Sequence, residues 1–131
     1  MLGLIALLWL AAGTAAACES TGGITPPRGR IESSGIVVVF RTQPPVIELG
    51  RHFMVDVLVC ADDGAPVLTR VDAHMPEHRH GMNYRPTLTS QGTGRYRAEG
   101  FLFHMPGLWQ FLFDVEHAGR RTRLSSDMML E

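Results

Sequence analysis

Side chains that bind soft metal ions are concentrated in one short stretch of the sequence, residues 74–82. It contains three histidines and two methionines, which are His74, Met75, His78, His80 and Met82. A second His-Met-Pro sequence follows and contributes His104 and Met105. Imidazole and thioether groups suit copper, whereas magnesium and calcium prefer oxygen ligands. The two stretches predict a copper site if the fold brings them together.

The spacing of His78 and His80 meets a geometric requirement for sharing an ion. Side chains two residues apart on a β-strand point to the same side and lie about 6.5 to 7 Å apart. Met82 has the same parity and adds a thioether if the strand stays regular. The placement of His74 depends on a bend at Pro76, while His104 lies where a strand enters a turn.

Packing is the alternative role for Met75 and Met105. Both residues precede a proline, and a methionine at such a turn can simply fill an irregular gap at the end of the core. Carboxylates also stand near the candidate ligands, at Asp72 and Glu77. Thioethers favour Cu(I), imidazoles alone also suit Cu(II) and zinc, and a carboxylate ligand shifts the preference toward zinc or Cu(II). We expect copper, as Cu(I) or Cu(II).

Catalytic motifs are absent from the sequence, and we expect that the protein is not an enzyme. Glu77-His78 is followed by Arg79-His80, which is the wrong order for a His-Glu-x-x-His metalloprotease helix. No Gly-x-Ser-x-Gly elbow or glycine-rich phosphate loop occurs. The formal net charge of −1 offers no basic surface for nucleic acid.

The elements that position these residues are predicted to be β-strands. Trp109, Phe111, Phe113 and Val115 alternate with other residues, so they share one face of a core strand. No sustained period of 3.6 residues occurs after residue 17. We predict an all-β, immunoglobulin-like antiparallel β-sandwich of about seven strands, with a small β-barrel as the alternative. The strands are expected within residues 36–40, 46–50, 53–60, 67–74, 95–103, 108–115 and 121–130.

Three segments divide the chain. Residues 1–17 are an apolar run that ends in Ala-Ala-Ala and is too short to span a bilayer, which is typical of a signal peptide. Residues 18–34 are rich in Gly, Pro, Thr and Ser and are predicted to be a flexible leader. Residues 35–131 form the sandwich domain. Periplasmic or secreted location is therefore expected, with no stable membrane span in the mature chain.

The two cysteines, Cys18 and Cys60, allow two interpretations. An even count in an exported protein favours a disulfide, which would tie the mature N-terminus to the end of an apolar strand. Alternatively, Cys18 is a lipid-modified first residue that anchors the protein to a membrane. Its Ala-Ala-Cys context supports this weakly, and lipidation would leave Cys60 as an unpaired thiol.

Three motifs in order resemble the YtkA-like, or FixH-type, domain of bacterial envelope proteins. They are Met-Pro-x-His-x-His-Gly-Met at residues 75–82, Gly-x-Tyr at residues 94–96 and Phe-His-Met-Pro-Gly-x-Trp at residues 103–109. The resemblance implies an immunoglobulin-like sandwich at the cell envelope, with copper handling or cytochrome oxidase assembly in some members. This sequence lacks the membrane-spanning helix of the FixH type, which argues against a role in oxidase assembly.

Two functional hypotheses follow. The first is an exported copper-binding protein that acts as a carrier, buffer or assembly factor. Its partners would be a copper-dependent envelope protein or a copper transporter. The second is a metal-free interaction or assembly module of the envelope, in which the His-Met-Pro sequences only shape turns.

Overall fold

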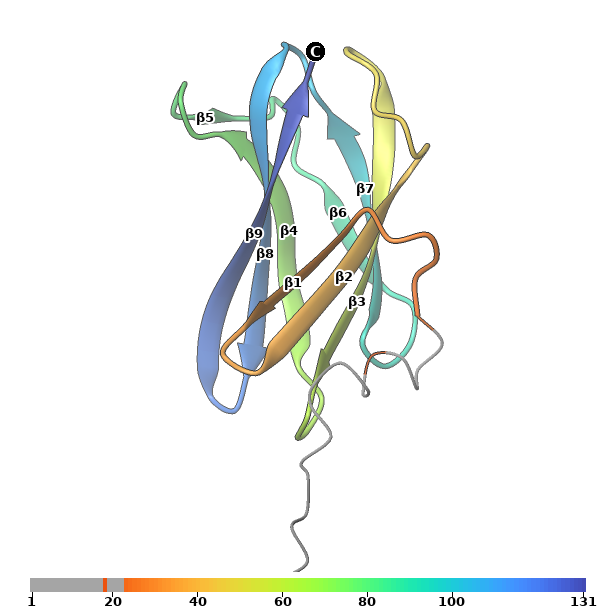
Figure 1. The fold of residues 1–131 in the computed structure, drawn as a ribbon, viewed down its shortest axis with the longest axis vertical. Coiled ribbons are helices and arrows are strands. Elements are labelled where there is room, and N and C mark those ends of the chain that lie inside the picture. Colours follow the sequence, from red (N-terminus) through yellow and green to blue (C-terminus); the bar gives the residue numbers. More distant parts are fainter. Residues whose placement is uncertain (1–17, 19–22) are drawn as a thin grey trace, which may run out of the picture.

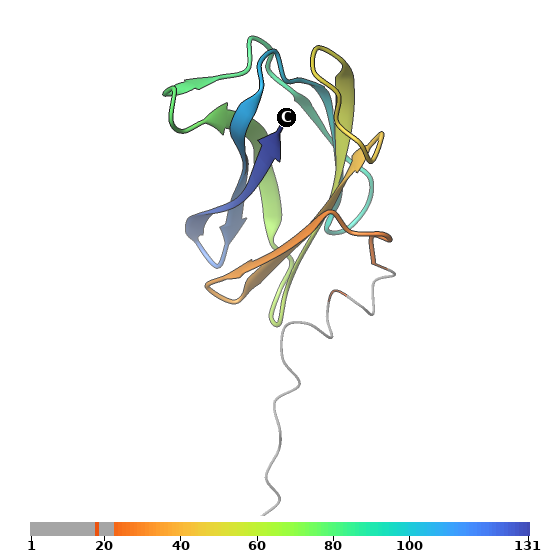
Figure 2. The ribbon, with the colours of Figure 1, turned by 45° about the horizontal axis from the view of Figure 1, so that its top comes forward.

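The computed structural model describes Cys18 and residues 23–131, which fold into two antiparallel β-sheets (Figure 1). The sheets face each other and enclose the core between them (Figure 2). The five-stranded sheet has the order β1 (Gly29–Ser33), β2 (Ile36–Gln43), β3 (His52–Ala61), β7 (Arg95–Leu102) and β6 (Thr87–Ser90). The four-stranded sheet has the order β5 (His80–Gly81), β4 (Val67–Met75), β8 (Gly107–His117) and β9 (Arg120–Leu130).

The core consists of alternating apolar side chains from the inner faces of both sheets. In β8, the predicted face of Trp109, Phe111, Phe113 and Val115 is confirmed, since all four are fully buried. The facing strands β2 and β3 contribute alternating valines and phenylalanines to the same cluster. The prediction of an all-β sandwich is therefore confirmed at the level of two packed antiparallel sheets.

The strand predicted at residues 46–50 does not form, because these residues lie in the irregular segment between β2 and β3, and three short strands were not predicted. β1 forms within the segment predicted to be a flexible leader, and pairs with β2 from Gly29 to Ser33. β5 has two residues and β6 has four, so neither carries enough alternation to be recognised.

In β4, a bulge between Leu68 and Arg70 shifts the register, and the buried face becomes Leu68, Val71, Ala73 and Met75. The predicted alternation holds only after the bulge.

A disulfide joins Cys18 to Cys60, with their Cα atoms 5.6 Å apart. Cys18 and Ile24 cover a small apolar cluster on the outer face of the five-stranded sheet, together with Val37 and Leu58. The bond confirms the predicted pairing and uses the Cys18 sulfur that a lipid would need. It also indicates an oxidising compartment outside the cytoplasm. The predicted signal peptide, residues 1–17, lies outside the described residues.

Strand β5, the end of β4 and the turn between β7 and β8, which carry the candidate ligands, lie at one end of the sandwich, at the top of Figure 1 beside the C-terminus. We call this the histidine end and define it as residues 48–51, 76–86 and 103–106. A hydrogen bond from the Gly50 N–H to the Phe103 carbonyl, 2.8 Å long, joins the first of these segments to the third. Within the part of the chain that the structure describes, no helix is long and apolar enough to cross a membrane.

Candidate metal centre

The two ligand-rich stretches, residues 74–82 and 103–107, meet at the histidine end through His80 and His104. The His80 ring lies between two others, with its centroid 5.8 Å from that of His78 and 5.4 Å from that of His104. All three imidazoles are exposed to solvent. Residues 24 positions apart in the sequence are therefore brought into one open cluster, which we call the histidine triad.

A tight turn, rather than a regular strand, brings His78 beside His80. Residues 76–79 form the turn, which is closed by a hydrogen bond from the His78 N–H to the Met75 carbonyl, 3.2 Å long. Arg79 adopts a left-handed conformation, with φ of 55°, and this reverses the chain between the two histidines. The expectation that His78 and His80 share one strand face is therefore wrong, although their rings are adjacent.

Trp109 anchors the second His-Met-Pro turn. Its indole N–H donates a hydrogen bond of 3.0 Å to the Met105 carbonyl, and its ring stacks on Phe103 with centroids 4.2 Å apart. His104 contacts the same indole edge to face, at 5.6 Å between centroids, and His80 does so at 6.4 Å. Because Trp109 is fully buried, the histidine triad has a rigid aromatic base. The alternation of apolar residues predicts Trp109 in the core but does not connect it with the site.

The three predicted thioether ligands come from the same two stretches of the chain as the histidine triad. Met75 is the cross-strand partner of His80, and it is fully buried with its methyl group against Gly107. Met82 and Met105 are half-buried and pack on the core. Their packing agrees with the gap-filling role, and their location also leaves them near the imidazoles.

His74 projects from the opposite side of β4 to Met75, because successive side chains on a strand alternate. Its Nε2 lies 2.8 Å from the Gln110 Oε1, while the Gln110 amide nitrogen donates to Asp127 at 2.8 Å. The Gln110 oxygen can only accept a hydrogen bond, so the His74 Nε2 carries a proton. That nitrogen is therefore not free to bind a metal, and the structure does not bring His74 into the triad.

The ring separations match what one bound ion requires. An ion about 2.0 to 2.1 Å from an imidazole nitrogen lies about 3.1 Å from the ring centroid, so two rings on one ion have centroids about 4.5 to 6 Å apart. The separations of 5.8 and 5.4 Å fall in this range. Among the described residues, however, no three His, Cys, Asp or Glu side chains are already arranged to hold an ion. The planes of the adjacent rings lie 30° and 33° apart, and the free nitrogens must turn toward a common point to bind one ion.

The hydrogen bonding of His80 leaves one nitrogen available. Its Nδ1 lies 3.0 Å from the Gly81 carbonyl oxygen, which can only accept, so Nδ1 carries the proton. The lone pair is then on Nε2. The contact with the backbone carbonyl orients the ring, as hydrogen bonds to the second ring nitrogen do for histidines that bind metals. Of the two nearby carboxylates, Asp72 is paired with Arg70, while Glu77 is exposed in the turn.

The carboxylate of Asp56 forms a hydrogen-bonded network on the outer face of the five-stranded sheet. Asp56 of β3 accepts hydrogen bonds from Arg41, Gln43 and Arg97 at 3.1, 2.6 and 2.8 Å. Burial alone would raise the pKa of Asp56, but the hydrogen bonds and charges of Arg97 and Arg41 outweigh it and lower that pKa below its ordinary value. These groups fasten three strands together and do not contribute to the candidate site.

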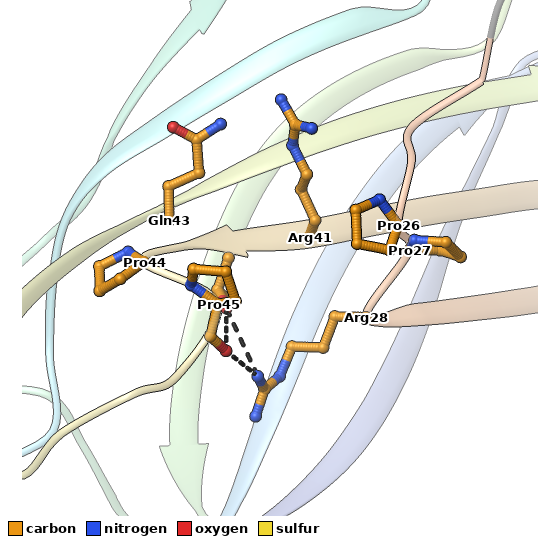
Figure 3. Close-up of a pocket in the computed structure, with 8 residues that line it drawn as sticks. Pro26, Pro27, Arg28, Arg41, Gln43, Pro44 and Pro45 are labelled. Carbon is orange, nitrogen blue, oxygen red and sulfur yellow. Dashed lines mark hydrogen bonds between the residues drawn. The ribbon is translucent and has the colours of Figure 1, made fainter.

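A groove of about 560 Å³ lies where β1 begins and β2 ends, and four prolines line it: Pro26, Pro27, Pro44 and Pro45 (Figure 3). The Arg28 guanidinium donates to the Pro45 carbonyl at 2.9 Å and to the Thr42 hydroxyl at 3.4 Å. None of the candidate ligands lines this groove. Its polar groups already have partners within the protein, so it offers no evident ligand chemistry.

Comparison of the chain with family models, with curated proteins and with solved structures gives no match. The functional interpretation therefore depends on the residues and their geometry.

Proposed function

We propose that this protein binds copper at the histidine end, through His78, His80 and His104. The observation that carries the proposal is the spacing of the three imidazoles, whose neighbouring centroids lie 5.8 and 5.4 Å apart. His80 is central because it contacts both other rings. Its Nε2 also carries the free lone pair.

Exposure of the histidine triad supports a role in handling the ion rather than in storing it permanently. All three rings reach solvent, so a ligand from another protein can approach a bound ion directly. We propose an exported carrier, buffer or assembly factor that is periplasmic or secreted, and whose partner is a copper-dependent envelope protein or a copper transporter. The disulfide supports export. We also propose that the protein is a member of the YtkA-like family and has an immunoglobulin-like topology.

A competition titration tests the proposal. The mature protein is titrated with Cu(II) against a chelator of known affinity, together with the variants His78→Ala/His80→Ala and His117→Ala. His117 is the matched control because it is the last residue of β8, whereas Trp109, which contacts the histidine triad, lies near the start of that strand. We expect a Kd tighter than about 1 μM, equivalent to about 8 kcal/mol, for the wild type and the control.

The double variant should bind at least about 100-fold more weakly, a loss of about 2.7 kcal/mol. His80→Ala alone should weaken binding more than His78→Ala or His104→Ala, because His80 is the central ring. Equal affinities for the wild type and the double variant would refute the proposal.

A metal-free interaction module is the second candidate function. Exposed apolar side chains at or beside the histidine end favour it: Leu49 is 50% exposed, Tyr84 47% and Met129 61%. Exposed apolar patches often mark protein interfaces. This candidate predicts that His78→Ala/His80→Ala leaves partner capture intact, whereas Leu49→Ser/Tyr84→Ser abolishes it. Loss of capture in the histidine variant would contradict it.

A further inference from the structure

Four methionines at or next to the histidine end form a more buried layer than the exposed histidine triad. Met75, Met82, Met105 and Met128 are buried or half-buried and all pack on the core. Met75 pairs with His80 across β4 and β5, and Met128 pairs with Trp109 across β8 and β9. Met75, Met82 and Met105 therefore come from the same two stretches of the chain as the exposed imidazoles and are less exposed than they are.

Depth separates the two kinds of donor. Directly opposed side chains on paired strands have Cβ atoms about 4.5 to 5.5 Å apart, so the Met75 thioether can reach the region under His80. His80 is exposed, whereas Met75 is fully buried. Methionine has three rotatable side-chain bonds, so its sulfur can turn toward an ion without a change in the backbone.

The chemistry of the two layers suits different ions. Thioethers are soft, uncharged ligands that favour Cu(I), while imidazoles also suit Cu(II). The cost of taking an ion out of water rises with the square of its charge, so a monovalent ion enters a partly buried site at about a quarter of the cost of a divalent one. A sulfur layer under an exposed nitrogen layer therefore favours the monovalent ion at the deeper level.

We propose that the thioethers of Met75, Met82 and Met105, with the His80 imidazole, form a site for a soft monovalent cation, Cu(I), below the surface that takes Cu(II). The inference rests on the proposed copper function and extends it by assigning a different ligand set to each ion, with His80 common to both. It concerns the binding of each ion as supplied, with no electron-transfer step.

The test uses Ag(I), a redox-inert monovalent probe, and the full mature protein labelled with ¹³C at the methionine ε-methyl groups. We expect Ag(I) to shift the signals of Met75, Met82 and Met105, while those of Met54 and Met129 stay in place. Met75→Leu/Met82→Leu/Met105→Leu replaces each thioether by a side chain of similar volume. This variant should bind Ag(I) at least about 30-fold more weakly and Cu(II) within about threefold of the wild type. Met54→Leu/Met129→Leu is the matched control.

Two outcomes overturn the inference: unshifted ε-methyl signals of all three methionines, or unchanged Ag(I) affinity in the triple variant. If the triple variant loses its fold, Met82→Leu alone provides the affinity test, because Met82 is only half-buried. Failure of the proposed function has a different signature. In that case His78→Ala/His80→Ala leaves Cu(II) affinity unchanged, whatever the methionine variants do.

Discussion

Replacement of Asp56 by asparagine should destabilise the protein strongly at neutral pH. The Asp56 carboxylate is 8% exposed, and it accepts hydrogen bonds from Arg41, Gln43 and Arg97. An asparagine keeps the shape but loses the charge. Its NH₂ group would replace one of the two carboxylate oxygens and cannot accept the hydrogen bonds that this oxygen accepts. A charge-assisted hydrogen bond contributes about 1.5 to 3 kcal/mol.

Solvent reduces that contribution here, because the side chains of Arg97 and Arg41 are 31% and 36% exposed and remain hydrated when the carboxylate is lost. The free energy of unfolding should therefore fall by about 2 to 4 kcal/mol, below the upper end of the range for broken buried ion pairs.

The pH dependence identifies the cause of the loss. Because the arginines hold the pKa of Asp56 below its ordinary value, the folded state binds this proton less readily than the unfolded state. The stabilisation is then complete above the unfolded pKa of about 3.9 and is lost as the pH falls through the folded pKa. Urea unfolding of the wild type and Asp56→Asn, at steps from pH 7 to pH 2.5, should give a difference that is constant above about pH 5 and shrinks below about pH 4. A difference under about 0.5 kcal/mol at pH 7, or one that is as large at pH 2.5 as at pH 7, would refute this reasoning.

Three further predictions concern the disulfide and two backbone positions. Cys18→Ala/Cys60→Ala removes a link between residues 42 positions apart and should lower the free energy of unfolding by about 4 kcal/mol in urea titrations, because the disulfide restricts the unfolded chain. A decrease of less than about 1 kcal/mol would contradict this reasoning. Arg79→Gly should stabilise the protein by about 1 kcal/mol in thermal unfolding, because glycine adopts the φ of 55° without steric cost, and a destabilised variant would count against the turn geometry. Gly107→Ala should cost about 1 to 3 kcal/mol and shift the Met75 ε-methyl NMR signal, since φ is 127° and the new methyl group would lie 2.9 Å from the Met75 Cε. An unmoved Met75 signal would show that the methyl group is not packed there.

The longer strands were predictable because their side chains alternate between the core and the outside. β8 is the clearest example, with its aromatic face from Trp109 to Val115 fully buried. β5 and β6 were not predictable, since strands of two and four residues contain almost no periodic signal. β1 was missed because its residues are exposed or half-buried and largely polar. The bulge between Leu68 and Arg70 in β4 was not predictable, because the apolar alternation before Val71 shows no break there.

The approach of the two ligand-rich stretches was predicted from their ligand types, and His80 does lie beside His104, but the geometry that brings them together was not predicted. His78 and His80 are brought together by a left-handed Arg79, and a non-glycine residue gives no sequence signal for that conformation. The exclusion of His74 depends on its hydrogen bond to Gln110, a pairing across strands that only the register reveals. Trp109 was recognised as a core residue, yet its contacts with His80 and His104 depend on tertiary structure.

Pulsed electron paramagnetic resonance of the Cu(II)-loaded protein tests the central claim most directly, because it detects the remote nitrogens of coordinated imidazoles. The account predicts signals from at least two imidazoles in the wild type and in His117→Ala, and fewer in His80→Ala. A Cu(II) complex without imidazole signals, or one that His80→Ala leaves unchanged, would contradict it.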